Sequence, residues 1–270
     1  MDDLRPPPPP VPELPEPQLA ELEAVPWRAR ETIFVVLLAF ATTLFFSLVL
    51  FAAMGVRSGT RTETTYGLLT GIIAEALFGV WVFIWIKLRY QRGRDSLGLL
   101  RHEGDLGAGL LAGFLGLGAS LVVSQIVFTL ARQVTEGPVK TPEQIPNEVG
   151  GAAQVFLAVV LAVIAAPIAE EILFRGFLYQ ALRKWKGVTG GAVISAIIFG
   201  LSHIDFAGLG AGIRDNDASE IVSSLLIVLP TLVLGVILAH LFERRRSLVA
   251  PIVAHSVYNI VGVILILTTN

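Results

Sequence analysis

The chain has 270 residues, of which 54% are hydrophobic and only 16% are charged, and its formal net charge is −2. Soluble domains carry about 25% charged residues, so this composition predicts a multi-pass integral membrane protein that faces the lipid bilayer. The net charge of −2 suggests that the protein has no nucleic-acid partner. The sequence contains no cysteine, which excludes disulfides, thiolate metal ligands and a thiol nucleophile.

The chain opens with a segment rich in proline and acidic residues, MDDLRPPPPPVPELPEPQ. Such a composition cannot build a packed core, so residues 1–31 are predicted to be a disordered cytoplasmic tail. The opening has neither the basic region nor the early apolar stretch of a signal peptide. We expect residues 32–148 to form N-terminal membrane helices and residues 149–268 to form a helical core that carries the polar residues.

The remainder of the sequence predicts an all-α bundle of membrane helices, about seven or eight of them, with no β domain. A membrane span needs about 20 mainly apolar residues. Seven segments come close to this length: 32–54, 66–88, 106–131, 152–182, 189–204, 222–242 and 249–268. Pro167 predicts a kink or break in the fourth segment. The Gly- and Asp-rich stretch 204–220 is expected to be non-helical.

The distribution of basic residues predicts the orientation of these spans. With the N-terminus in the cytoplasm, fourteen of the twenty Lys and Arg residues lie in cytoplasmic segments and five lie in segments on the other side. Cytoplasmic loops of membrane proteins carry an excess of Lys and Arg. We therefore expect a protein of the cell membrane with a cytoplasmic N-terminus.

The fourth apolar segment contains two adjacent carboxylates, Glu170 and Glu171, followed by Arg175. An ionisable side chain within a membrane costs at least a few kcal/mol and marks a candidate functional site. Glu171 and Arg175 are four residues apart, so they can pair on one helix face. Glu170 is rotated by about 100° from Glu171 and remains available for chemistry. Alternatively, all three side chains form an ion cluster that only holds helices together.

Two further pairs, Phe199 with His203 and His255 with Asn259, also have four-residue spacing, which places each pair on one helix face. Each pair could be structural, since a hydrogen bond between membrane helices contributes about 1 kcal/mol. A glutamate beside an imidazole can instead deprotonate a water molecule. A second imidazole and an amide can donate hydrogen bonds to a developing oxyanion. Together these groups would suit hydrolysis of an amide bond without a covalent intermediate.

The three patterns occur in the order EExxxR, FxxxH and HxxxN, and they resemble the motifs of the CAAX protease and bacteriocin-processing family. These proteins are intramembrane glutamic endopeptidases related to Ras-converting enzyme. The runs FGLSH and LVLGVILAHLFERRRSLVAPIVAHSVYN are also similar to that family. The resemblance covers about residues 151–267 and leaves out the first three spans.

The resemblance implies a role for each polar residue. Glu170 would be the general base that activates water, His203 would help to position or activate that water, and His255 and Asn259 would line the oxyanion site. Three more side chains would support the site: Glu171, Arg175 and Phe199. The implied enzyme is a metal-independent glutamic endopeptidase that needs no cofactor. Its substrate would be a membrane-associated peptide or protein, with or without a lipid modification, cut near the C-terminus or close to the membrane.

Other catalytic mechanisms are open at this point. Glu170, His203 and His255 could ligate zinc, although the HExxH motif of many zinc peptidases is absent. A serine nucleophile would have to be Ser202 or Ser256. Each lies next to a histidine in sequence, which points the two side chains apart on a helix, and there is no GxSxG motif.

A non-catalytic function is also open. A membrane immunity or scaffold protein of the same fold could use the polar network structurally. A transporter could use Glu170 or Glu75 as a proton site, since both are ionisable residues within apolar segments. No inverted repeat of the kind found in many transporters is visible in the sequence. Glu75 lies in the second span and belongs to none of the three motifs.

Overall fold

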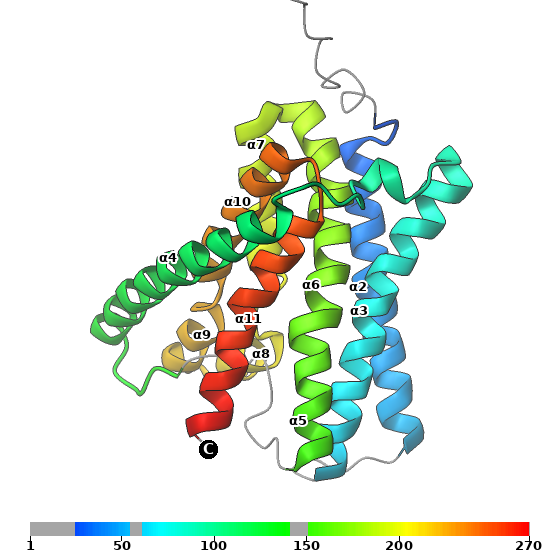
Figure 1. The fold of residues 1–270 in the computed structure, drawn as a ribbon. Helices are drawn as coiled ribbons and strands as arrows, with labels where there is room; N and C mark the ends of the chain where they lie inside the picture. Colours follow the sequence, from blue (N-terminus) through cyan, green and yellow to red (C-terminus); the bar gives the residue numbers. More distant parts are fainter. Residues whose placement is uncertain (1–24, 55–60, 141–150, 270) are drawn as a thin grey trace, which may run out of the picture.

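A computed structural model describes residues 25–54, 61–140 and 151–269. Within these ranges the chain forms helices and no strand, and the helices pack as a bundle (Figure 1). The predicted all-α membrane bundle is confirmed. The helical elements in chain order are α2 (Ala29–Met54), α3 (Arg61–Tyr90), η1 (Arg94–Leu97), α4 (Asp105–Val134), α5 (Ala152–Val159), η2 (Val160–Ala165), α6 (Ala166–Glu171), η3 (Ile172–Tyr179), α7 (Gln180–Leu201), α8 (Phe206–Asp215), α9 (Ala218–Leu225), α10 (Val228–Arg245) and α11 (Val249–Thr269).

Five helices in the described ranges are long and apolar enough to cross a membrane: Ala29–Leu50, Glu63–Tyr90, Asp105–Val134, Ala152–Leu201 and Ala218–Arg245. A shorter apolar helix covers Val249–Ile264. Ala152–Leu201 is counted as a single candidate span because it is helical almost throughout, although the chain turns sharply within it. The number of about seven spans therefore stays a prediction.

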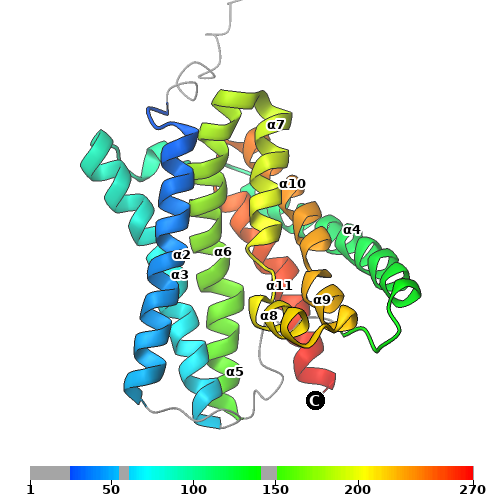
Figure 2. The same cartoon turned by 180° about the vertical axis from the view of Figure 1, so that it is seen from behind.

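The sharp turn lies at Gly187, within α7 (Figure 2). Gly187 has φ 74° and ψ 178°, a conformation that is essentially restricted to glycine. The two arms of the turn come so close that a Cβ on Gly191 would lie 2.6 Å from the backbone nitrogen of Arg183. The turn separates the segments predicted as the fourth and fifth spans, and it returns the chain toward the middle of the bundle.

The prediction that residues 204–220 are non-helical is wrong. Phe206–Asp215 forms α8, and α9 begins at Ala218. Two of the three aspartates in this stretch are helix caps: Asp205 accepts hydrogen bonds from the amides of Ala207 and Gly208, and Asp217 caps α9 in the same way.

The segments predicted to be cytoplasmic gather at one end of the bundle, at the top of Figure 1. Arg183 pairs with Glu243 at 3.0 Å, and the Nζ of Lys184 donates to the carbonyl of Val25 at 3.3 Å. These contacts connect the Gly187 turn with the end of α10 and with the segment before α2. The basic segments therefore share one end, while the orientation of that end in a membrane stays a prediction.

The predicted tail boundary at residue 31 is too late in the chain. Residues 1–24 lie outside the described residues, but residues 25–31 are packed against the bundle. Trp27 is fully buried, its Nε1 donates to the carbonyl of Phe177 at 3.0 Å, and α2 begins at Ala29. An indole that buries its ring and satisfies its N–H holds this segment in place.

The helix that carries His255, α11, lies against α4 through a face of small residues. A Cβ on Gly109 would lie 2.6 Å from the carbonyl oxygen of Ala250, and one on Gly113 would lie 2.8 Å from that of Ala254. Small residues four positions apart let two membrane helices approach at backbone distance. Helix α4 therefore fixes α11 from the side opposite to the polar residues of α6.

Candidate active site

The predicted irregularity at Pro167 is present as a π-helical segment, η2, that precedes it. The amide of Ala166 bonds to the carbonyl of Leu161, five residues back. The next donor in this register would be Pro167, which has no N–H. The carbonyl of Ala162 is therefore left without that partner, and the Nδ2 of Asn259 donates to it at 2.7 Å.

A second carbonyl near Pro167 is satisfied in the same way. In a regular α-helix the Val163 carbonyl would accept from residue 167, and here the Oγ of Ser256 donates to it at 2.8 Å. A membrane interior offers no water to replace a missing donor, so side chains of a neighbouring helix supply it. These two bonds connect α11 to η2 and set the position of His255 relative to α6.

The predicted ion pair between Glu171 and Arg175 is present and completely buried. Arg175 Nη1 donates to Glu171 Oε1 at 2.6 Å, and Nη2 donates to the carbonyl of Gly235 on α10 at 3.3 Å. The guanidinium carbon lies 4.4 Å from the centre of the Phe199 ring, a cation–π contact. The same Glu171 oxygen lies 3.0 Å from His255 Nδ1. Glu171 therefore forms a structural ion pair with Arg175 and also orients the His255 ring.

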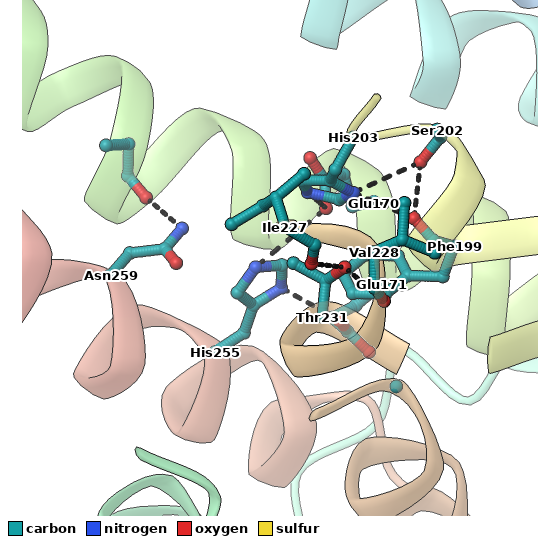
Figure 3. A network of polar contacts seen from close by, with 12 residues as sticks. Glu170, Glu171, Phe199, Ser202, His203, Ile227, Val228, Thr231, His255 and Asn259 are labelled. Atoms are coloured by element: carbon teal, nitrogen blue, oxygen red, sulfur yellow. Dashed lines mark hydrogen bonds and ion pairs between the residues drawn. The ribbon is translucent and has the colours of Figure 1, made fainter. Parts of the chain in front are cut away.

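Glu170 lies between the two histidines (Figure 3). Its Oε2 is 3.8 Å from His255 Nε2 and 4.0 Å from His203 Nε2. This oxygen is buried and has no hydrogen-bond partner among the described residues. Other parts of the Glu170 and His203 side chains are accessible, since these side chains keep 10% and 18% of their surface exposed. The structure thus brings together three groups that the sequence places far apart.

Backbone and carboxylate acceptors allow the proton positions on the two imidazoles to be inferred. His203 Nδ1 lies 2.8 Å from the carbonyl of Phe199, which can only accept, so Nδ1 carries the hydrogen. His255 Nδ1 faces Glu171 Oε1 in the same way. These assignments come from the hydrogen-bond partners and not from observed hydrogens. Both rings are therefore turned so that Nε2 faces Glu170.

Phe199 packs in the centre of this arrangement and is fully buried. Its ring centre lies 4.7 Å from the His203 ring, 5.7 Å from the His255 ring and 5.1 Å from the Phe174 ring. The ring limits the positions available to both imidazoles, and its carbonyl orients His203. Phe199 therefore occupies the packing position that the resemblance implies.

Asn259 is the predicted site residue that the structure does not place beside Glu170. Its amide points to Ala162 on η2, apart from the two histidines (Figure 3). Sequence reasoning missed this partner, as well as Ser256 and the Gly235 carbonyl. The missing N–H of Pro167 was a signal for the first two, whereas a backbone carbonyl on another helix leaves no trace in the sequence. The oxyanion role of Asn259 stays a prediction.

The described residues give no support to the serine alternative, because the hydroxyl groups of Ser202 and Ser256 each donate to a backbone carbonyl. Among the described residues, no group of three or more His, Asp or Glu side chains is arranged to hold a metal ion. A cavity of about 280 Å³ is lined by residues 101–106, none of which belongs to the predicted site.

Comparison with known proteins finds one matching family. Residues 152–261 match the family model described as Type II CAAX prenyl endopeptidase Rce1-like. No curated protein and no solved structure matched the chain. The matched region contains all seven predicted site residues and excludes α2, α3 and α4. The resemblance predicted from the three motifs is confirmed, because residues 152–261 are similar to the Rce1-like family of type II CAAX prenyl endopeptidases.

Proposed function

We propose that the protein is an intramembrane endopeptidase in which Glu170 activates a water molecule for attack on a peptide bond. One observation carries this proposal: a buried Glu170 oxygen without a partner is faced by the Nε2 atoms of His203 and His255 at 4.0 and 3.8 Å. Glu171 differs in that its Oε1 is bound to Arg175 and lies 3.0 Å from His255 Nδ1, although its Oε2 also has no hydrogen-bond partner among the described residues.

The spacing of Glu170 and His203 suits one water molecule. Glu170 Oε2 and His203 Nε2 are both acceptors, and a water between them can donate one hydrogen to each. Glu170 takes a proton as the water oxygen attacks the peptide carbonyl, which gives a tetrahedral intermediate. Glu170 then returns that proton to the leaving amine nitrogen as the carbon–nitrogen bond breaks. General-base catalysis of this kind contributes about 10²- to 10⁴-fold to the rate.

His255 is placed to act on the intermediate. Its Nδ1 is held by Glu171, which is in turn held by Arg175, so the ring has one fixed orientation. In its protonated form, His255 carries a second N–H on Nε2, directed toward the Glu170 side of the site. A donor fixed in this way stabilises the negative oxygen of the intermediate without having to reorganise.

The proposed substrate is a membrane-associated peptide or protein, cut near its C-terminus or close to the membrane. The description of the matched family names CAAX prenyl endopeptidases, which supports a peptide that carries a prenyl group. A site within apolar helices is suited to such a chain, because the lipid group can remain in the bilayer while the peptide reaches Glu170. No step of this mechanism requires a cofactor.

The test is cleavage of a synthetic C-terminal CAAX peptide, prenylated or unmodified, by the purified protein in proteoliposomes. We expect Glu170→Gln and His203→Ala to lower kcat by at least about 100-fold. Glu103→Gln, which changes an exposed glutamate outside the site, is the matched control and retains the wild-type rate. The thermal unfolding midpoint of each variant establishes that it is folded. Wild-type activity in Glu170→Gln would refute the mechanism.

Two outcomes would favour the alternative functions. Loss of cleavage on treatment with a chelator, with recovery on addition of zinc, would favour a zinc-dependent membrane protease. A folded wild-type protein that binds the peptide without cleaving it would favour a non-catalytic immunity or scaffold protein. A glutamic endopeptidase predicts chelator-resistant cleavage that depends on Glu170.

A further inference from the structure

Glu75 on α3 is a carboxyl group for which neither the family match nor the mechanism accounts. It lies outside residues 152–261 and in none of the three motifs. The residue is half-buried, but its Oε2 is buried and has no hydrogen-bond partner among the described residues. Buried polar atoms in folded proteins are almost always paired, so an unpaired carboxyl oxygen within a membrane helix requires an explanation.

The packing of α3 places Glu75 near the level of Glu170. Helix α3 runs beside α5, η2 and α6 in the same direction (Figures 1 and 2). Gln154 Nε2 donates to Thr65 Oγ1 at 2.9 Å, and a Cβ on Gly71 would lie 2.8 Å from Leu161 Cδ2. Residues of α3 therefore lie at the same height in the bundle as residues of α5 and η2 whose numbers are about 90 higher.

This register puts Glu75 level with about residue 165, five residues before Glu170. At 1.5 Å per residue, the axial separation is roughly 7–8 Å, which two glutamate side chains can largely bridge.

No other charge in the described part of the chain competes for Glu75. The neighbouring segments α5 and η2 contain no titratable residue. On α2, Glu31 contacts Tyr90, the last residue of α3 and fifteen residues beyond Glu75, and Arg30 lies next to Glu31 in sequence. On η3, Arg175 is paired with Glu171. The charged groups that face Glu75 are therefore those of the proposed active site.

We propose that Glu75 is a positioning residue of this site, and that Glu75 and Glu170 hold one proton between them. The inference rests on the proposed function of Glu170 as the water-activating base. Two carboxyl groups that interact in a low-dielectric interior disfavour a second negative charge, so they titrate as a pair. Glu75 acts through the charge of Glu170 and does not touch the substrate.

The proposal predicts a change in pH dependence that a purely structural residue would not cause. In Glu75→Gln the amide keeps the shape of a protonated glutamate but cannot take the negative charge. Glu170 then ionises without competition, and the acid limb of the kcat/KM profile moves to lower pH by about one unit. Glu75→Asp keeps a carboxyl group and retains the wild-type profile. Glu63→Gln, on the same helix but twelve residues earlier, is the matched control.

The direct test is the infrared C=O stretch of a protonated, buried carboxyl group, measured on the full-length protein in lipid across the pH range. We expect this band at neutral pH in the wild type, Glu75→Asp and Glu63→Gln, and its loss in Glu75→Gln. An unchanged band, or kcat/KM profiles that superimpose for the wild type and Glu75→Gln, would overturn the shared proton. Because the band is measured without substrate, absent wild-type cleavage would refute the proposed function and not the shared proton.

Discussion

The hydrogen bond from Asn259 to the Ala162 carbonyl predicts that Asn259 and Pro167 are energetically coupled. The bond exists because Pro167 cannot supply an N–H to this part of the helix. Asn259→Ala removes a bond worth about 1 kcal/mol and leaves a carbonyl unsatisfied in the membrane interior, so we expect the protein to lose about 1–2 kcal/mol of stability. In a Pro167→Ala background, residue 167 regains an N–H. The same Asn259→Ala change should then cost about 1 kcal/mol less.

The assay is equilibrium unfolding in mixed detergent micelles, followed by circular dichroism, for the wild type, both single variants and the double variant. Ser256→Ala provides a parallel cycle, because Ser256 serves the Val163 carbonyl beside the same proline. A cost of Asn259→Ala that is equal in both backgrounds, within the 0.3–0.5 kcal/mol expected for independent sites, would refute the reasoning. Cleavage by the same proteins separates the two roles of Asn259, because a restored backbone N–H can replace a helix contact but cannot bind an oxyanion.

Two further stability predictions use the same unfolding measurement. Arg175→Met leaves the Glu171 carboxylate buried without its cation and should cost about 3–5 kcal/mol, whereas adding Glu171→Gln should recover part of this loss; a loss below about 1 kcal/mol would contradict the account. Gly187→Ala should cost about 1–3 kcal/mol because its backbone conformation is strained for any residue with a Cβ. Gly67→Ala, in α3 with open space around its Cβ, should not destabilise the protein, and an equal loss in both variants would argue against strain at the turn.

The sequence predicts the membrane bundle and the pair of Glu171 with Arg175 because both depend on local information. Apolar length identifies a span, and four-residue spacing places two side chains on one helix face. The same spacing placed Phe199 under His203. The assembly of Glu170, His203 and His255 is not local, and the sequence indicated it only through the complementary chemistry of these side chains and through the family resemblance.

The sequence-based predictions failed where the structural role of a residue depends on its tertiary or capping contacts and not on its residue type. Asp205 and Asp217 were interpreted as loop residues, but they cap α8 and α9, so composition alone predicted the wrong structure for residues 204–220. Trp27 anchors a segment that proline content assigned to the tail. Asn259 has a partner that depends on how α11 packs against η2, and that packing cannot be derived from the spacing of His255 and Asn259.

The central claim is that the protein cleaves membrane peptides with Glu170 as the base, and a comparison of membrane peptidomes tests it without assuming a substrate. Membranes that contain the wild-type protein or Glu170→Ala at equal abundance would be analysed by mass spectrometry. The account predicts uncleaved precursors that accumulate only with Glu170→Ala, together with matching products that appear only with the wild type. Identical peptidomes from the two membranes would contradict it.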